Sequence, residues 1–287
     1  MKLLSKLKIY LELTKFEHSI FALPFALSAV VILEKGFPPL EKILWILVAL
    51  ISARTAGMAF NRFFDLPFDK LNPRTKDWAS VKGLVKPIEI LMLAIVSSVV
   101  FIFSAYMLNK LAFYLSPIVI LFLILYPLGK RFTTFVHFIL GIIYFLIPIA
   151  VSIALKGKIE LSMIYLGLAM AFWVSGFDIL YAIQDINFDK KIGLHSIPAK
   201  FGIKKALITA RVFHLLTLIF LILTGISANL GVVYFTGLVM LGIFLIYEHS
   251  LITHENLSKI NKAFFTVNGF ISIIFFIIVF SDIYFFN

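Results

Sequence analysis

Long apolar stretches follow one another along almost the whole chain. A transmembrane helix needs about 20 mainly apolar residues, and an interior proline does not exclude one, because neighbouring helices can satisfy the carbonyl that it frees. The nine stretches closest to this length run roughly over residues 16–33, 42–60, 88–108, 112–128, 135–155, 161–180, 206–226, 231–248 and 264–282. The pattern predicts an all-α integral membrane protein, a bundle of about nine transmembrane helices.

The composition agrees with a membrane protein. Hydrophobic residues make up 61% of the 287 residues and charged residues 14%, against roughly 25% charged residues in soluble domains. This balance excludes a disordered chain, and it leaves too little charge to cover a soluble globule. The absence of cysteine excludes a disulfide framework, a thiolate metal site and a cysteine nucleophile. No linker-like tract interrupts the spans, so residues 1–287 are expected to form one domain.

The basic residues are unevenly distributed between the two sides of the predicted bundle. The chain carries 26 Lys and Arg against 15 Asp and Glu, a net charge of +11. If each predicted helix crosses once, 20 of these basic residues fall on the side of the N-terminus and 5 on the other. The positive-inside rule then places the N-terminus on the cytoplasmic side of the cell membrane, together with the long links over residues 61–87 and 181–205.

The first of these links begins with regularly spaced polar residues. Asn61, Asp65 and Asp69 are four positions apart, so their oxygen atoms would share one side of the helix if it continues beyond residue 60. Pro67 should loosen the helix there. We therefore expect Asp69 to lie on a bent segment.

The second link carries a matching stripe. Asp178, Tyr181, Asp185 and Asp189 stand at intervals of three and four residues, which again places them on one helical face. Six of the seven aspartates of the chain lie in or beside the two links, and only Asp282 lies elsewhere. A single such cluster would suggest no more than a solvated helix end, but the two together predict acidic walls that face each other across a pocket.

The chemistry of these walls indicates a cation. Packed carboxylates stay ionised together at neutral pH only if positive charge neutralises them, and hard oxygen ligands without a His or Cys set favour Mg²⁺. Basic residues around the same rim suit a diphosphate. A diphosphate held where apolar helices begin indicates a ligand with a polar head and a long apolar tail.

Several separated motifs follow one another in a fixed order along the chain: residues 16–25, 54–62 with Asp65 and Asp69, 72–75, 126–127, 130–133, 178–189, 193–196 and 201–202. Together they resemble the UbiA-type intramembrane prenyltransferases, in the branch of 4-hydroxybenzoate polyprenyltransferase, over essentially the whole chain. Two positions depart from the family pattern. Residues 76–80 replace a common Arg-Pro-Leu, and Leu66 replaces a common arginine.

The resemblance implies a helical bundle whose two acidic cytoplasmic loops cap a central cavity. It also implies Mg²⁺-dependent transfer of a prenyl group from a polyprenyl diphosphate to an aromatic acid such as 4-hydroxybenzoate, in quinone biosynthesis. Asp178 and Tyr181 would orient the acceptor's phenol or take its proton. The remaining catalytic residues implied are Asp65, Asp69, Asp185 and Asp189, which with Asn61 would also be the metal ligands.

A set of basic and polar residues is expected to contact the two substrates. Arg54 lies two helical turns before Asn61 inside an apolar span, where a charged residue costs roughly 3 kcal/mol and therefore needs a partner. The resemblance suggests that this partner of Arg54 is the acceptor's carboxylate or an acidic residue of the site. The alternative is a structural ion pair with an aspartate of the bundle. The other expected substrate-binding residues are His18, Asn61, Arg62, Arg74, Lys130 and Arg131.

Two other functions stay open at this point. The same chemistry could act on a naphthoate acceptor of menaquinone synthesis, or the protein could be a transporter, in which acidic residues near the bilayer midplane would be expected. The acidic residues here lie at helix ends and in loops, which favours the enzyme. No nucleic-acid partner is expected, and the acceptor, the prenyl chain length and the oligomeric state do not follow from the sequence.

Overall fold

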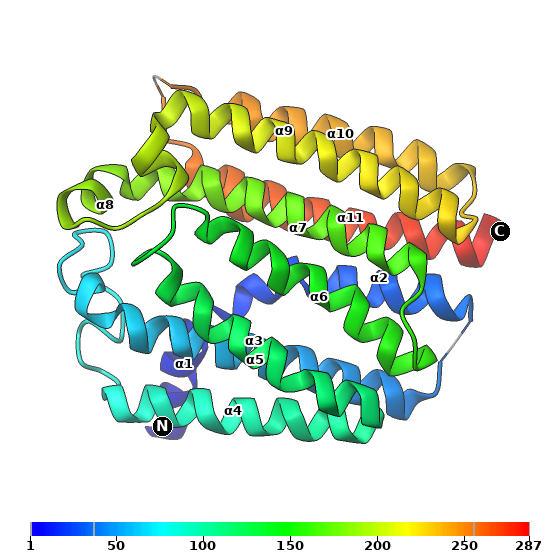
Figure 1. Cartoon of the computed structure of the whole chain (residues 1–287), viewed down its shortest axis with the longest axis horizontal. Coiled ribbons are helices and arrows are strands. Elements are labelled where there is room, and N and C mark those ends of the chain that lie inside the picture. The colour runs from blue at the N-terminus through cyan, green and yellow to red at the C-terminus, as the bar shows by residue number, and fades with distance from the viewer. Residues whose placement is uncertain (1, 37, 255, 287) are drawn as a thin grey trace.

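The computed structural model describes residues 2–36, 38–254 and 256–286, with the side chains of residues 2–5, 7 and 16–18 excepted. Over these residues the protein consists of helices and connecting segments without strands, arranged as an elongated bundle (Figure 1). The long helices are α3 (Leu40–Asp69), α4 (Pro87–Leu108), α5 (Lys110–Gly129), α6 (Val136–Lys156), α7 (Leu161–Ala182), α9 (Ile197–Ala228), α10 (Val232–Leu251) and α11 (Asn268–Ser281). This confirms the predicted all-α membrane architecture.

The predicted count of nine spans is approximately right. Eight helical stretches of the described chain are long and apolar enough to cross a membrane, and Ser19–Glu34 is a shorter apolar one. The predicted span 16–33 starts instead with the 3-10 turn η1 (Phe16–Phe21), and α2 (Leu23–Glu34) begins beside Pro24. A proline suits the first turn of a helix because the N–H that it lacks would have no partner there. The short helix α1 (Lys2–Leu13) precedes this turn.

Helix α3 is longer than predicted and carries the first acidic stripe. It continues without a break through Pro67 and ends only at Asp69. Pro67 lies two residues before this end, so its missing N–H removes a single bond from the last turn. Asn61, Asp65 and Asp69 consequently lie on one continuous helix.

The second acidic link is also helical. After α7, the chain forms the 3-10 turn η2 (Ile183–Asp185) and the short helix α8 (Ile186–Ile192). Gly193 ends α8 with a φ of 76°, a left-handed conformation that glycine adopts without strain. Helix α8 lies at the same end of the bundle as the last turn of α3 and the segment that follows it (Figure 1). Both acidic stripes therefore belong to one end of the bundle.

Helices α6 and α7 pack unusually closely. A Cβ atom on Gly141 of α6 would lie 2.9 Å from the Ala171 carbonyl oxygen of α7, and Gly167 of α7 would come as close to the Phe145 carbonyl oxygen. Small residues allow backbones in membranes to approach in this way. Helix α7 forms the centre of the core, where Trp173 is the largest fully buried side chain.

Asp282, the aspartate outside the acidic links, holds the opposite end of the bundle together. It belongs to the π-helical turn Asp282–Phe286, and its carboxylate accepts the Gly231 N–H at 2.6 Å and the Tyr234 N–H at 2.9 Å. The side chain is fully buried and caps the N-terminus of α10, where the backbone leaves N–H groups unpaired.

We expect Asp282→Ala to destabilise the folded protein by about 2 kcal/mol, because a lost N-cap costs roughly this much and the buried N–H groups lose their acceptor. Asp282→Asn should retain most of the stability, since its amide oxygen still accepts one bond. Thermal unfolding in detergent checks this. Equal unfolding temperatures for wild type and Asp282→Ala would show that the cap does not contribute.

Candidate active site

A cavity of about 370 Å³ lies between helices α3, α5, α6 and α7. Much of its lining is apolar, with Ile46, Leu50 and Ala150 among the residues. The acids Asp65, Asp69, Asp185 and Asp189 lie at its mouth. Every expected site residue with a described side chain lines it. These residues are Arg54, Asn61, Arg62, Asp65, Asp69, Arg74, Lys130, Arg131, Asp178, Tyr181, Asp185 and Asp189.

The first acidic wall is formed by the end of α3. The Asn61 amide donates to Asp65 Oδ2 at 2.9 Å, which orients that carboxylate along the helix. The Asp69 side chain is buried, and its Oδ2 atom has no hydrogen-bond partner within the described residues. Thr75 donates to the Asp69 backbone carbonyl at 2.6 Å and so ties the following segment to this wall. Asp69, which lines the cavity, thus has one carboxylate oxygen without a hydrogen-bond donor from the described residues.

The second wall is held by the segment that follows α3. Arg74 pairs with both oxygens of Asp185, at 2.9 Å from Nε and 2.8 Å from Nη2, and the Asn72 amide donates to Asp185 Oδ1 at 3.0 Å. Arg74 Nη1 also donates to the Tyr181 hydroxyl at 3.2 Å. Asn72 was not among the residues expected in the site, although its motif was. These contacts bring residues more than 100 positions apart into one pocket.

Asp189 is held from two further elements. Lys130 Nζ, just after α5, lies 3.4 Å from Asp189 Oδ2, and the Ser196 hydroxyl donates to the same oxygen at 3.1 Å. The backbone N–H of His195 donates to the Lys130 carbonyl at 2.7 Å, so the turn after α5 and the segment after α8 are joined. Each acid of the second wall therefore already has a basic partner from the chain.

The carboxylates determine the charge of these basic partners. Burial lowers the pKa of Lys130, but Asp189 and Asp185 raise it more, so that the pKa lies above its ordinary value. Burial acts in the same direction on Arg74, and the Asp185 carboxylate again reverses the effect and raises the pKa. Both side chains are positively charged at neutral pH.

The donor set suits a hard divalent cation, although no three His, Asp or Glu side chains of the described chain converge on one point. Asp65 and Asp69 on one wall and Asp185 and Asp189 on the other provide oxygen donors only, the kind that Mg²⁺ prefers. The orphaned Asp69 Oδ2 is the clearest sign of a missing partner. On the second wall, Arg74 and Lys130 pair with Asp185 and Asp189.

Two of the expected substrate-binding arginines have strong internal partners. Arg62 is buried, donates from Nε to the Leu13 carbonyl at 3.1 Å and stacks on Trp78 with 3.7 Å between its Cζ atom and the ring centroid. Arg131 donates to the Phe64 carbonyl at 2.6 Å. Trp78 lies in the segment that departs from the family pattern, and the stack on Arg62 gives that departure a structural role.

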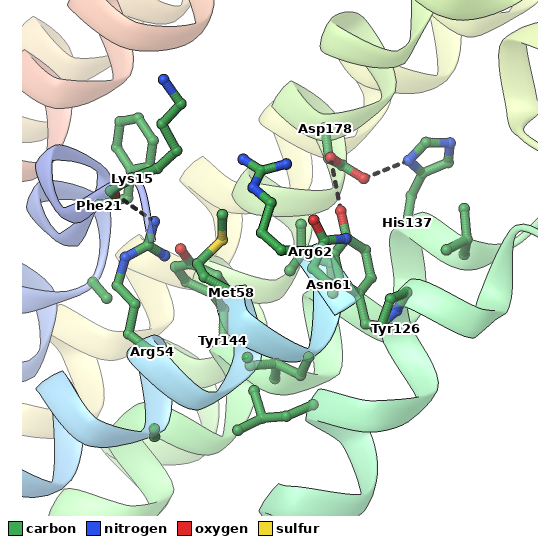
Figure 2. A pocket seen from close by; sticks show the side chains of 18 of the residues that line it. Lys15, Phe21, Arg54, Met58, Asn61, Arg62, Tyr126, His137, Tyr144 and Asp178 are labelled. Atoms are coloured by element: carbon green, nitrogen blue, oxygen red, sulfur yellow. Dashed lines mark hydrogen bonds and ion pairs between the residues drawn. The ribbon is translucent and has the colours of Figure 1, made fainter. Parts of the chain in front are cut away.

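A second polar group lies deeper in the cavity, around Asp178 of α7 (Figure 2). His137 Nδ1 lies 2.7 Å from Asp178 Oδ2, and the Tyr126 hydroxyl donates to Asp178 Oδ1 at 3.4 Å. His137 was not among the expected site residues, because a single histidine in the first turn of an apolar helix has no spacing pattern that marks it. The structure thus adds a buried imidazole to the site.

Arg54 projects into the same cavity from the middle of α3 (Figure 2). It precedes Asp65 by about three helical turns. Its Nη2 donates to the Lys15 carbonyl at 3.4 Å, and its guanidinium interacts with the Tyr144 hydroxyl. No hydrogen-bond partner for the buried Nε atom is found among the described residues. Among the described side chains, Arg54 therefore has a partly satisfied guanidinium and no carboxylate partner.

Aromatic rings complete the cavity wall. Tyr181 packs on Phe264 with ring centroids 4.2 Å apart, and Phe264 meets Phe177 edge-on at 5.2 Å. Phe264 comes from the π-helical turn Lys262–Val267, which precedes α11. With 32 phenylalanines in the chain, no sequence signal could single this one out. His18, expected as a substrate-binding residue, lies on η1, and its side chain falls outside the described part of the structure.

Comparisons with known proteins agree with this architecture. The chain is similar to 4-hydroxybenzoate octaprenyltransferases, with 30% identity to that of Shewanella woodyi over 93% of this chain and 94% of the relative. It is 29% identical to the one from Vibrio atlanticus, with the same coverage.

Solved structures share the fold. A UbiA homolog from Aeropyrum pernix K1, solved in its apo form, matches with a TM-score of 0.82 and 31% identity over 93% of this chain and 98% of the homolog. A UbiA homolog from Archaeoglobus fulgidus, bound to GPP and Mg²⁺, matches with a TM-score of 0.74 and 20% identity over 96% of this chain and 99% of the homolog. The model of the UbiA prenyltransferase family matches residues 22–274. The chain belongs to the UbiA prenyltransferase family.

Proposed function

We propose that this protein transfers a polyprenyl group from a polyprenyl diphosphate to 4-hydroxybenzoate or a closely related aromatic acid. The observation that carries this proposal is a cavity with acidic walls at its mouth and a separate polar group, Asp178 with Arg54, deeper inside. The curated relatives named for 4-hydroxybenzoate support this acceptor over a naphthoate. The acidic walls gather at one end of the bundle and do not lie midway along it, as a transporter site would.

The donor's diphosphate would lie between the acidic walls, with its tail along the apolar lining. Asp65, Asp69, Asp185 and Asp189, with Asn61, would hold Mg²⁺. The bound ion supplies positive charge that stabilises the diphosphate as the allylic C–O bond breaks. Arg74 and Lys130 can donate to diphosphate oxygens from the second wall, and the rings of Tyr181 and Phe264 can stabilise the allylic cation through their faces.

The acceptor would lie between Arg54 and Asp178. Arg54 would bind its carboxylate, and Asp178 would take the phenol proton, which makes the ring more electron-rich. The ring carbon next to the phenol oxygen then bonds to the first carbon of the prenyl group. The polar mouth and the positively charged loops support an orientation in the cell membrane with both acidic segments on the cytoplasmic side.

Purified protein, incubated with a prenyl diphosphate and a panel of aromatic acids, tests the proposal. We expect a product with the mass of a C-prenylated 4-hydroxybenzoate, formed with Mg²⁺ and lost with excess EDTA, because only hard oxygen ligands line the mouth. Unfolding temperature is measured in parallel and should change little. A prenylated naphthoate as the main product would show that the acceptor is a naphthoate and not 4-hydroxybenzoate. Turnover that persists in EDTA would contradict the metal assignment.

A further inference from the structure

We propose that His137 is a positioning residue for this reaction. Its Nδ1–H group donates to the Asp178 carboxylate and keeps it turned toward the acceptor's phenol. The inference rests on the proposed function, because it specifies how the proton-accepting group of that reaction is prepared. Asp178 begins the second acidic stripe, but it and His137 lie deeper in the cavity than Asp185 and Asp189.

The backbone around His137 is fixed by close helix packing. His137 lies in the first turn of α6, and the Ser175 hydroxyl of α7 donates to its backbone carbonyl at 2.9 Å. One turn further along α6, Gly141 lets the two helices approach, since a Cβ there would lie only 2.9 Å from the Ala171 carbonyl oxygen. The distance between the backbones of His137 and Asp178 is thus set by close helix packing.

The imidazole ring is fixed at both nitrogens. Nε2 accepts the backbone N–H of Ile197 at 3.4 Å, so the proton of the neutral ring resides on Nδ1, which faces Asp178 Oδ2 at 2.7 Å. The side chain has no solvent exposure. Because a backbone N–H occupies Nε2, His137 cannot take the phenol proton itself. It can only donate to Asp178, and this distinguishes a positioning residue from a base.

Asp178 needs such a donor. It lies in an apolar membrane-spanning helix, where a polar side chain needs a hydrogen-bonding partner. Its other described side-chain contact is the long bond from Tyr126 at 3.4 Å. The shortest contact to Asp178 therefore comes from His137.

Asp178 accepts a proton and returns it during the reaction. The phenol O–H gives its proton to Asp178 as the neighbouring ring carbon bonds to the prenyl carbon and the diphosphate leaves with the electrons of the C–O bond. The resulting dienone loses its ring proton to the diphosphate or water, and its oxygen regains a proton from Asp178. Asp178 ends ionised again, with one proton released, and the His137 bond is unchanged throughout.

Acceptors of graded phenol acidity test the role of His137. We expect His137→Leu to lower kcat for 4-hydroxybenzoate by about 10²-fold, the size of a general-base contribution, with the acceptor KM changed less than about threefold. With 3-chloro-4-hydroxybenzoate, whose phenol ionises more readily, the loss should shrink to below about tenfold. His137→Gln keeps an N–H donor and should recover most of the turnover. A purely structural role would reduce all acceptors equally.

Matched variants separate the possible outcomes. His254→Leu changes an exposed histidine outside the cavity and should behave as wild type. If His137→Leu does not fold, His137→Met removes the same donor. An equal loss for both acceptors, or wild-type kcat in His137→Leu, would overturn the inference. If the wild type does not prenylate benzoates, the proposed function fails instead. The same variants are then compared on the hydroxylated aromatic acid that the wild type accepts.

Discussion

Asp69→Asn is expected to lower prenyl transfer by at least about 10³-fold while the protein remains folded. The substitution removes one negative charge from the first wall, and loss of a ligand that holds a catalytic metal costs several kcal/mol of transition-state stabilisation. Asp69 Oδ2 has no hydrogen-bond partner among the described residues, so the change breaks no side-chain contact there. Product formation and the unfolding temperature, measured on the same preparation, separate catalysis from folding.

Asp77→Asn is the matched control for this variant. Asp77 lies eight residues further along, is largely exposed and pairs with Lys82 at 2.9 Å. An exposed ion pair contributes little to stability, so activity should stay within about twofold of wild type. Asp189→Asn should resemble Asp69→Asn in activity, since it removes charge from the opposite wall. Wild-type turnover by both Asp69→Asn and Asp189→Asn would show that the acidic walls do not take part in the reaction.

Arg54→Ala is expected to raise the KM of the aromatic acid by about 10²-fold and to leave the KM of the prenyl diphosphate within about twofold. Loss of a buried partner of a carboxylate costs about 2–5 kcal/mol. Arg54 lies about three turns of α3 before Asp65, the first acid of the walls that would bind the diphosphate. The measurement is steady-state kinetics with each substrate varied in turn.

Arg211→Ala serves as the control for Arg54, because Arg211 is an exposed arginine of α9 that does not line the cavity. An acceptor without its carboxylate, such as phenol, gives an independent reading: its weak use should be insensitive to Arg54→Ala. If the acceptor KM does not change, Arg54 serves only to hold the Lys15 carbonyl and the Tyr144 hydroxyl, the partners that it has in the structure.

The sequence predicted the parts of the fold and site that follow from short-range spacing. Asn61, Asp65 and Asp69 are four residues apart, so their shared face needed only a continuing helix. Pro67 lies within the last turn of α3, and the helix continues past it to Asp69. The start of α2 was placed too early, because hydropathy does not distinguish the 3-10 turn at residues 16–21 from a regular helix.

Contacts between distant segments could not be predicted in this way. Arg74 was expected to bind substrate, yet its bidentate partner Asp185 is 111 residues away, and only the packing of two loops at one end of the bundle reveals the pair. His137 and Phe264 enter the site through helix packing and a π-helical turn, neither of which leaves a periodic signal. Such residues need a structure, since their importance lies in what they face.

The two ion pairs of the second wall have a consequence for how the protein matures. A buried carboxylate without a counter-charge costs several kcal/mol, yet Asp185 already pairs with Arg74 and Asp189 with Lys130. The newly inserted chain can therefore complete its fold before any metal ion or diphosphate arrives. Cells starved of the ion should accumulate normal amounts of the protein in an inactive but recoverable form.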